Sequence, residues 1–355
     1  MKISGLHRLA LTVAAAGFCA AVPASMAAAQ DVASFYKGKN IDVYIGYSTG
    51  GGYDTYARVL VRHMGKHLPG NPSMTPRNMP GAGSLLLANA LANSLPKDGT
   101  TFGTVARAAA FEPLFDNPQA KFDPTKFTWI GSMNNEVSVC GFWHTAVVKT
   151  VEDLLTKPHV VGGTGPGSDT DNFPLTMNNV LGAKLKLITG YPGGNDVNLA
   201  IERGEVEGRC GWSWSSVKST RPQWIAEKKL DVTVQFALEK HPDLPNVPLI
   251  LDLAKNDRQR QILEVVFSGQ PMGRPYVAPP AVPADRVKAL RDAFAAMMKD
   301  PEFIAEADKA KLEIELVSGE KVAAIVDRIS AMPKDILKEA GEASSKRDNV
   351  IQEKK

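Results

Sequence analysis

Ser48 lies in a glycine-rich stretch that could support two kinds of chemistry. Gly46, Ser48 and Gly50 form the G-x-S-x-G pattern in which a serine hydrolase holds its nucleophile. The same stretch, Ile41 to Leu60, also reads as a strand, a glycine turn and a helix. A turn of that kind can bind an anion through its backbone amides.

The hydrolase alternative fits the surrounding sequence poorly. A nucleophile elbow normally follows several strands, but only a short segment of the exported chain precedes this strand. Thr49 and three consecutive glycines make the loop broader than a single tight turn. No downstream Asp or His stands in a recognisable triad position. Substitution of Ser48 by Ala would abolish an esterase and only weaken a binding protein.

The anion-binding alternative has a direct physical basis. Gly50–Gly52 can adopt positive φ and leave their N–H groups unobstructed. We expect Asp54 to be the N-cap of the following helix. Glycine turns at residues 162–168 and 191–195 also follow a strand and precede a helix. Three such turns predict a cleft lined by loop amides from two sides.

The elements around these turns alternate between strand and helix. Residues 41–104 and 138–214 both repeat the order of strand, short turn and helix. This order predicts two α/β units built on parallel strands with right-handed crossovers. A mature chain of roughly 325 residues suits two domains of ~150 residues each.

The first residues predict export. Lys2 and Arg8 precede the apolar run Leu9–Ala21, and an A-x-A pattern ends at Ala29. We therefore expect a signal peptide over residues 1–29, cut after Ala29, and a periplasmic protein. Its removal lowers the formal charge from +3 to about +1. A near-neutral chain gives no electrostatic reason to expect nucleic acid or membrane as partner.

Cysteine and histidine leave few sites for redox or metal chemistry. Cys140 and Cys210 remain after export. Their spacing fits either a disulfide or two buried thiols. His63 and His67 lie four residues apart on a predicted helix, without a third ligand. We expect no metal site and no cofactor.

Five segments, in order, resemble one receptor family. They are "YIGYSTGGGYDTYAR", "NMPGAGS", "ANSLPKDGTTFGT", "GYPGGNDVNLAIERGEVEG" and "HPDLPNVPLILDL". They are similar to the extracytoplasmic solute-binding receptors of tripartite tricarboxylate transporters, the TctC-like or Bug family. The resemblance runs from about Phe35 to Ile329. It implies a type II periplasmic-binding-protein fold, in which two α/β domains joined by crossing strands close on a ligand cleft.

The resemblance also implies domain bounds and a disulfide. The first domain would comprise residues 30–138, and the second residues 139–264. Residues 265–345 would return to the first domain, and residues 346–355 would form a charged tail, frayed or helical. In this fold the strands carrying the two remaining cysteines are neighbours, which favours a bridge between them.

The ligand-binding residues carried over from the family lie in turns on both sides of the cleft. They are Tyr47, Ser48, Thr49, Gly50, Gly51, Gly52, Gly81, Ala82, Gly83, Thr164, Gly165, Gly167, Ser168, Tyr191 and Gly193. The chain departs from the family pattern at Gly46, where Pro is common, and at Ser84, where Gly is common. An Asp usual in the helix before Gly204 is replaced by Ala200 or Asn198.

Two further residues have alternative roles. Arg107 follows the strand "TFGTVA", at the edge of a sheet where ligands bind. We predict that it binds a carboxylate, since a guanidinium matches that group bidentately. The alternative is a surface or domain-bridging arginine. Trp212 could wall a bulky ligand or pack in the core.

These observations predict a monomeric periplasmic receptor. It would capture a small organic acid, close around it and deliver it to the permease subunits of a tripartite transporter. No bond would be broken. The first alternative is a sensor that presents the same acid to a signalling partner, and the second is the Ser48 hydrolase.

Overall fold

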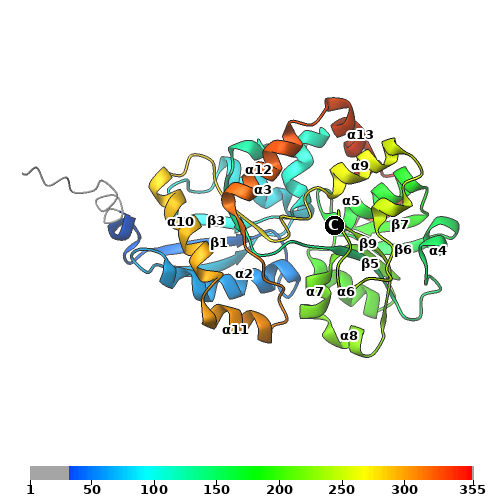
Figure 1. The fold of residues 1–355 in the computed structure, drawn as a ribbon, viewed down its shortest axis with the longest axis horizontal. Helices are drawn as coiled ribbons and strands as arrows, with labels where there is room; N and C mark the ends of the chain where they lie inside the picture. The colour runs from blue at the N-terminus through cyan, green and yellow to red at the C-terminus, as the bar shows by residue number, and fades with distance from the viewer. Residues whose placement is uncertain (1–31, 354–355) are drawn as a thin grey trace, which may run out of the picture.

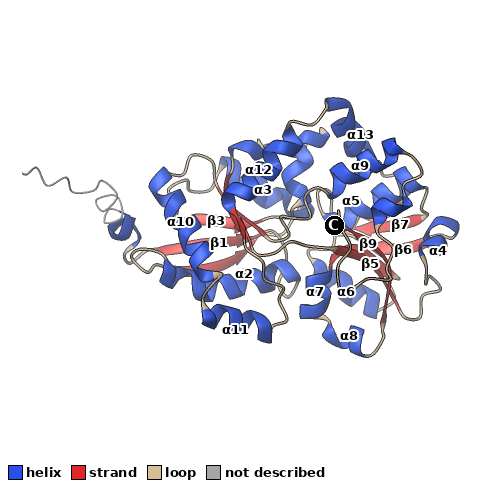
Figure 2. Cartoon of the chain, in the orientation of Figure 1, coloured by secondary structure: helices blue, strands red, loops and turns tan. Residues whose placement is uncertain are grey.

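The computed structural model describes residues 32–353, which form two lobes side by side (Figure 1). The predicted signal peptide lies outside the described residues. Each lobe contains a six-stranded sheet with helices packed against it (Figure 2). The prediction of two α/β units is therefore confirmed. None of the described helices is both long and apolar enough to cross a membrane.

The first lobe is built on a sheet with the order β11-β4-β10-β3-β1-β2. Its strands are β1 (Asn40–Ile45), β2 (Ser73–Asn78), β3 (Thr101–Thr104), β4 (Thr128–Ser132), β10 (Pro275–Ala278) and β11 (Val317–Ser318). Its helices are α2 (Gly52–His63), α3 (Leu85–Asn93), α10 (Ala284–Met297), α11 (Pro301–Lys309) and α12 (Gly319–Ser330). Short helical turns are η1 (Met64–His67), η2 (Ala82–Ser84), η3 (Ala108–Phe115) and η4 (Pro124–Lys126).

The second lobe is built on a sheet with the order β12-β7-β6-β8-β5-β9. Its strands are β5 (Ser138–Trp143), β6 (His159–Gly162), β7 (Leu185–Thr189), β8 (Gly208–Ser213), β9 (Leu230–Phe236) and β12 (Val350–Glu353). Its helical elements are α4 (Val151–Thr156), α5 (Asp169–Thr176), η5 (Met177–Leu181), α6 (Gly194–Glu202), α7 (Trp214–Thr220), α8 (Pro222–Ala226), η6 (Ile250–Leu253), α9 (Asp257–Phe267) and α13 (Lys334–Ser345).

Both sheets are mixed rather than wholly parallel. β1 is parallel to β2 and β3, as the alternation of elements predicts. β10 is antiparallel to both β3 and β4, and β5 is antiparallel to β8 and β9. The antiparallel strands β5 and β10 directly follow the segments in which the chain crosses between the lobes.

The strand β1 shows how sequence positions the site. Ile41, Val43 and Ile45 are buried at alternate positions of β1. The apolar face of α2 then buries Tyr56 and Leu60. The glycine turn between β1 and α2 therefore lies at the carboxyl edge of the parallel strands, where ligands bind in open α/β sheets.

The C-terminal segment differs from the predicted frayed or helical tail. After α12 the chain leaves the first lobe, and α13 packs on α5 and α9. β12 then pairs in parallel with β7 at the edge of the second sheet. The short β-branched pair Val350 and Ile351 within this charged segment favours a strand over a helix.

The two cysteines lie on the neighbouring antiparallel strands β5 and β8. Cys140 and Cys210 are joined by a disulfide and are both buried. The bridge links strands in the middle of the second sheet, beside the strand end that reaches the space between the lobes.

Candidate ligand-binding site between the lobes

A small cavity lies between the lobes, and both contribute to its wall. We call it the central cavity. It is lined by Tyr47, Gly51, Gly52, Tyr53, Thr164, Asp169, Thr170, Gly194, Arg209, Gly211, Ser213 and Ser216. The space open to the centre of a water-sized sphere is about 30 Å³. Because one water needs roughly 10–15 Å³ by this measure, the lobes are closed around a very small volume.

Direct hydrogen bonds hold the lobes together beside this cavity. The hydroxyl of Ser48 donates to Oδ2 of Asp196 over 2.5 Å. The N–H of Ser48 donates to the carbonyl of Pro192 over 3.2 Å, and the N–H of Gly83 donates to the carbonyl of Thr164 over 3.2 Å. The glycine turns predicted to hold a ligand are thus partly used in closure.

Two of these turns approach the opposite lobe closely at a glycine. A Cβ on Gly83 would lie 2.6 Å from the carbonyl oxygen of Pro166, across the interface. A Cβ on Gly193 would overlap the hydroxyl of Ser48. Gly83 also has a φ of +61°, which other residues rarely adopt. These glycines therefore serve the contact between the lobes.

Arg209 is the cation of the central cavity. Its Nη1 donates to the carbonyl of Gly194 over 3.1 Å and to Oδ1 of Asn198 over 3.4 Å. Its Nε is buried without a hydrogen-bond partner. No carboxylate of the described residues lies within ion-pair distance of its guanidinium. Burial lowers the pKa of Arg209 to about 9, because the charged form loses hydration.

Trp212 packs against this arginine from the core. The Arg209 guanidinium lies 5.1 Å from the centre of the Trp212 ring. Trp212 is buried and also contacts Trp224 edge to face. Of the two alternatives for Trp212, the structure places it in the core, where it supports Arg209 without lining the central cavity.

Arg107 is buried and already has an anionic partner. It forms an ion pair with Asp169, the first residue of α5 in the second lobe. It also donates to the carbonyl of Gly273 over 2.9 Å and to the hydroxyl of Ser138 over 2.8 Å. These contacts match the domain-bridging alternative, since the charge of Arg107 is compensated within the protein.

A second buried arginine joins the same network. Arg274 pairs with Glu136 over 3.3 Å and donates to the hydroxyls of Ser213 and Ser216 over 3.0 and 2.6 Å. Its guanidinium lies 4.7 Å from the centre of the Tyr53 ring. The crossing segments are therefore tied to the second lobe by buried charged groups.

Two tyrosines add neutral groups to the wall. The rings of Tyr47 and Tyr53 stack at 4.9 Å between centres. The hydroxyl of Tyr53 accepts a hydrogen bond from the N–H of Arg107 over 3.2 Å. Burial raises the pKa of Tyr47 and of Tyr53, so both are uncharged at neutral pH. They do not offset the charge of Arg209.

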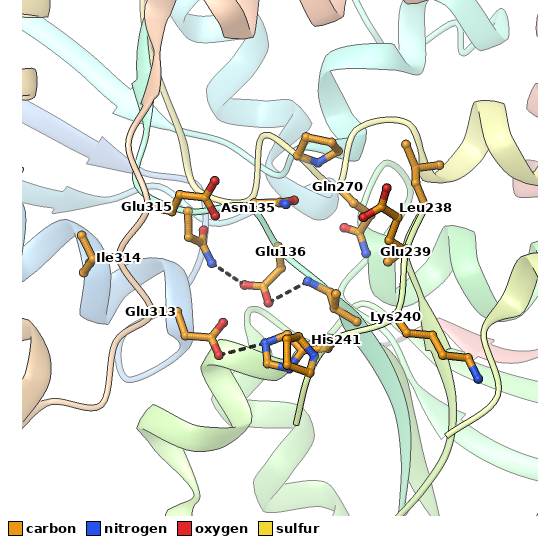
Figure 3. Close-up of a pocket in the computed structure, with 15 residues that line it drawn as sticks. Asn135, Glu136, Leu238, Glu239, Lys240, His241, Gln270, Glu313, Ile314 and Glu315 are labelled. Carbon is orange, nitrogen blue, oxygen red and sulfur yellow. Dashed lines mark hydrogen bonds and ion pairs between the residues drawn. The ribbon is translucent and has the colours of Figure 1, made fainter. Parts of the chain in front are cut away.

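A much larger pocket lies where the chain crosses between the lobes (Figure 3). We call it the crossing pocket. It has a volume of about 680 Å³ and is lined by residues 134–137 and 237–242, Gln270, Pro271 and residues 313–315. Its wall carries Glu136, Glu239, Glu313 and Glu315 against Lys240 and His241. This acidic wall does not suit an anion, despite its size.

Comparison with known proteins supports a binding-protein architecture. No family model matches the chain. A Cupriavidus necator protein described as "UPF0065 protein in gbd 5'region" is 27% identical over 354 residues, covering 94% of this chain and 98% of that protein. The periplasmic binding protein BugD has a TM-score of 0.69 at 18% identity, covering 86% of this chain and 99% of BugD.

Two further solved structures share the fold and hold acids. An R. palustris protein solved with adipate has a TM-score of 0.66 at 17% identity, covering 85% of this chain and 97% of its own. MatC from Rhodopseudomonas palustris, solved with bound malate, has a TM-score of 0.66 at 18% identity, covering 84% of this chain and 99% of MatC.

The chain has the fold of the Bug-type periplasmic binding proteins. The resemblance to the TctC-like or Bug receptors and the type II periplasmic-binding-protein fold are thereby confirmed. The two lobes, each with its own sheet, match the two α/β units of that fold.

Two departures from the Bug pattern compensate each other. Ser84 has a φ of +76°, a left-handed conformation that explains why glycine is common there. A Cβ on Gly46 would overlap the Cβ of Ser84. Gly46 thus leaves space for the Ser84 side chain, which accepts a hydrogen bond from the N–H of Ala106 over 2.7 Å.

The residues predicted from the Bug resemblance separate into groups. Those that line the central cavity are Tyr47, Gly51, Gly52 and Thr164. Those that line a pocket of about 300 Å³ at the edge of the interface are Gly81, Ala82, Thr164, Gly165 and Tyr191. Those that contact the opposite lobe outside both spaces are Ser48, Gly83 and Gly193. The remaining predicted ligand residues line neither space.

Among these, Thr49 and Gly50 are exposed. Gly167 has a φ of +83° in the turn before α5. Ser168 is the N-cap of α5 and accepts from the N–H of Asp171. These four residues shape the two turns and do not line the central cavity.

The expected cap of α2 needs a correction. Gly51 is the N-cap, and Asp54 is the third residue of the helix. The Asp54 carboxylate accepts from the N–H of Gly50 over 2.9 Å and from Arg58 and Asn78. These partners lower the pKa of Asp54 even though burial raises it. Asp54 therefore fixes the glycine turn from within the helix.

Eight lining residues of the central cavity were not predicted from sequence. They are Tyr53, Asp169, Thr170, Gly194, Arg209, Gly211, Ser213 and Ser216. In the strand "VEGRCGWSW", Arg209 is followed by small and aromatic residues that suit burial. That contrast was the available signal, because a buried charge requires a partner.

Neither the hydrolase nor a metal site gains support from the contacts. The Ser48 hydroxyl contacts a carboxylate, and no described histidine is hydrogen-bonded to it. His63 lies near Asp300 and Glu302, and a second group comprises His241, Asp243 and Glu313. In each group a lysine ammonium already pairs with the acids.

Proposed function

We propose that this chain is a periplasmic solute-binding protein that captures a small carboxylate between its lobes. It then delivers the acid to the membrane permease of a tripartite tricarboxylate-type transporter. The observation that carries this proposal is Arg209, an arginine without an acidic partner in the wall of a cavity between two lobes. A carboxylate would supply both the missing charge and a hydrogen-bond acceptor.

Several independent observations support the class of function. The related solved structures hold adipate and malate, which are carboxylates. The N-terminal sequence predicts a signal peptide, and the structural neighbours are periplasmic binding proteins. Capture and delivery of an acid require no bond cleavage and no cofactor, so we infer that the protein is not an enzyme. We also propose that it acts as a monomer.

The mechanism is closure around the ligand. Tyr47 and the amides of Gly51 and Gly52 come from the first lobe, while Thr164 and Arg209 come from the second. A ligand that contacts both sides stabilises the closed arrangement relative to an open one. The hydrogen bonds between the turns of the two lobes then add to this stabilisation.

A thermal-shift experiment tests the proposal. The mature chain, refolded to remove any bound compound, is heated with aliphatic and aromatic mono-, di- and tricarboxylates. A binder at 100 times its Kd stabilises the protein by about 2.7 kcal/mol, which raises the melting temperature measurably. We expect some acids, and no matched amides, to produce this shift.

The Arg209→Gln variant is the matched control in this thermal-shift experiment. It should melt cooperatively without ligand and lose the acid-dependent shift, because Gln retains polarity and removes the charge. A folded native protein that responds to no acid would contradict the proposed function. An unchanged response in Arg209→Gln would contradict the assignment of the site.

A further inference from the structure

Asp169 has a carboxylate oxygen without a hydrogen-bond partner at the central cavity. This oxygen accepts hydrogen bonds, whereas the Arg209 guanidinium donates them. Asp169 lines the cavity and is 6% exposed. Its Oδ2 pairs with Arg107, whereas its Oδ1 is buried without a hydrogen-bond partner. A buried acceptor that remains unsatisfied costs free energy, so a donor on the ligand would be favoured there.

The fold brings Asp169 and Arg209 into one wall. Asp169 begins α5, and Arg209 lies on β8, which packs against α5. Gly211 on the same strand has a φ of +71°, and a Cβ at this position would overlap the backbone of Asp169. The close approach of strand to helix therefore depends on Gly211.

The charges around the cavity specify the ligand charge. Three guanidinium groups, those of Arg107, Arg209 and Arg274, face two carboxylates, those of Asp169 and Glu136. The two ion pairs leave the charge of Arg209 uncompensated. A ligand with one negative charge balances this group, and a zwitterion does not. The donor that meets Asp169 should accordingly be a neutral hydroxyl rather than an ammonium.

The small volume of the central cavity favours a short ligand. The central cavity offers about 30 Å³ to the centre of a water-sized sphere, which corresponds to roughly two waters. Among organic acids whose carboxylate is attached to carbon, a 2-hydroxy acid is the smallest that presents both groups.

We propose that the ligand is a short 2-hydroxy monocarboxylate, whose carboxylate binds Arg209 and whose hydroxyl donates to Oδ1 of Asp169. This inference rests on the proposed function and narrows its substrate class. It distinguishes the site from a general carboxylate site, in which the chain attached to the carboxylate would matter only for its size.

Titration calorimetry on the refolded mature chain tests this selectivity. The probes are glycolate with acetate, L- and D-lactate with propionate, and L-alanine. Each hydroxy acid should bind at least about tenfold more tightly than its partner without the hydroxyl, because the partner leaves the acceptor unsatisfied. The preferred lactate should also bind more tightly than L-alanine.

The outcomes separate the inference from the function on which it rests. Equal affinities for lactate and propionate would overturn the inference and leave a carboxylate receptor. Tighter binding of L-alanine than of lactate would overturn the claim that the group donating to Asp169 is neutral. If no short acid bound but longer acids did, the inference would fail and the proposed function would stand. If no acid of any size bound, both would fail.

Asp169→Asn adds a test from the protein side. The carboxamide should reduce the preference for lactate over propionate by about tenfold while acid binding through Arg209 persists. An unchanged preference in a folded variant would overturn the role of Asp169. Should the variant fail to fold, since it removes the partner of Arg107, the ligand series on the native protein decides alone.

Discussion

The central cavity and the crossing pocket lie in the same interface between the lobes, yet among the charged residues of their walls that are not exposed, only Arg209 has no ion-pair partner in the described residues. In the crossing pocket, Glu136 is paired with Arg274, and Glu313 with Lys218. In the central cavity, Arg209 has no acidic partner. The crossing pocket is more than twenty times larger, with about 680 Å³ against about 30 Å³. We therefore base the proposed binding site on this unpaired, partly buried charge rather than on volume.

The ion pair of Arg107 with Asp169 should have the largest effect on stability. Arg107→Met would leave Asp169 as an uncompensated buried charge in the central cavity. We expect the free energy of unfolding in urea to fall by about 3–5 kcal/mol. The double variant Arg107→Met with Asp169→Leu should recover much of this loss, because no charge is then left unpaired. A single variant as stable as the native protein would show that the pair is not buried in solution.

A substitution beside Arg209 should make the central cavity resemble the crossing pocket. Asn198 already accepts a hydrogen bond from Arg209. Asn198→Asp would place a carboxylate on the same guanidinium and compete with the ligand. We expect acid affinity to fall by about 100-fold, or roughly 2.7 kcal/mol, with no loss of thermal stability.

The matched control for Asn198→Asp lies in the other pocket. Lys240 is exposed in the wall of the crossing pocket. Lys240→Gln lowers the protein charge by one, as Asn198→Asp does, but it should leave acid affinity unchanged in the same calorimetric titration. If the two variants weakened binding equally, the overall charge of the protein would affect acid binding more than the contact between Arg209 and the new carboxylate at position 198.

Some parts of this arrangement could be predicted from sequence and others could not. The alternating burial of β1 and the glycines after it indicate a strand, a turn and a helix, because these signals are local. The position of Arg107 just after β3 could also be predicted from the sequence. Its partner Asp169 could not be, because that contact depends on how the two lobes close.

The same limit applies to the glycine turns and Arg209. The sequence indicates that Gly83 and Gly193 need freedom from side chains, but that need arises from the opposite lobe rather than from a ligand. Arg209 acquires its role from its position on β8, its hydrogen bonds to α6 and the lack of an acidic partner among the described residues. Such a role requires tertiary structure.

A glycine pair can test closure without touching the charges. Gly83 and Gly204 have similar positive φ values of +61° and +73°. Only Gly83 faces the opposite lobe, and Gly204 has open space around it. Gly83→Ala should weaken acid binding by about tenfold, since crowding at a packed contact costs roughly 1–3 kcal/mol.

Gly204→Ala serves as the control for backbone strain. Both variants should lose similar thermal stability without ligand, and only Gly83→Ala should lose affinity. Equal affinities for both variants would mean that the turns do not meet when the ligand is bound.

The smallest expected effect concerns the acidic wall of the crossing pocket. Glu313, from the first lobe, meets Lys218 and His241 of the second lobe, with 3.2 Å to the His241 Nε2. Burial raises the pKa of Glu313, but the hydrogen bonds from His241 and Lys218 outweigh it and hold the pKa below 4.5. This carboxylate therefore stabilises the folded protein above about pH 4.5, and the stabilisation is lost as pH falls through the lowered pKa.

Glu313→Gln should remove that pH dependence. At pH 7 the variant should be less stable than the native protein by less than about 1 kcal/mol, because the cluster is partly exposed. The difference should shrink progressively in urea titrations at pH 5, 4 and 3, as the native carboxylate becomes protonated. Acid affinity at the central cavity should change only slightly, since Glu313 affects closure and not the ligand. A stability difference that stayed constant from pH 7 to pH 3 would show that Glu313 acts through packing, and the ionic contrast between the two pockets would then rest on Arg209 alone.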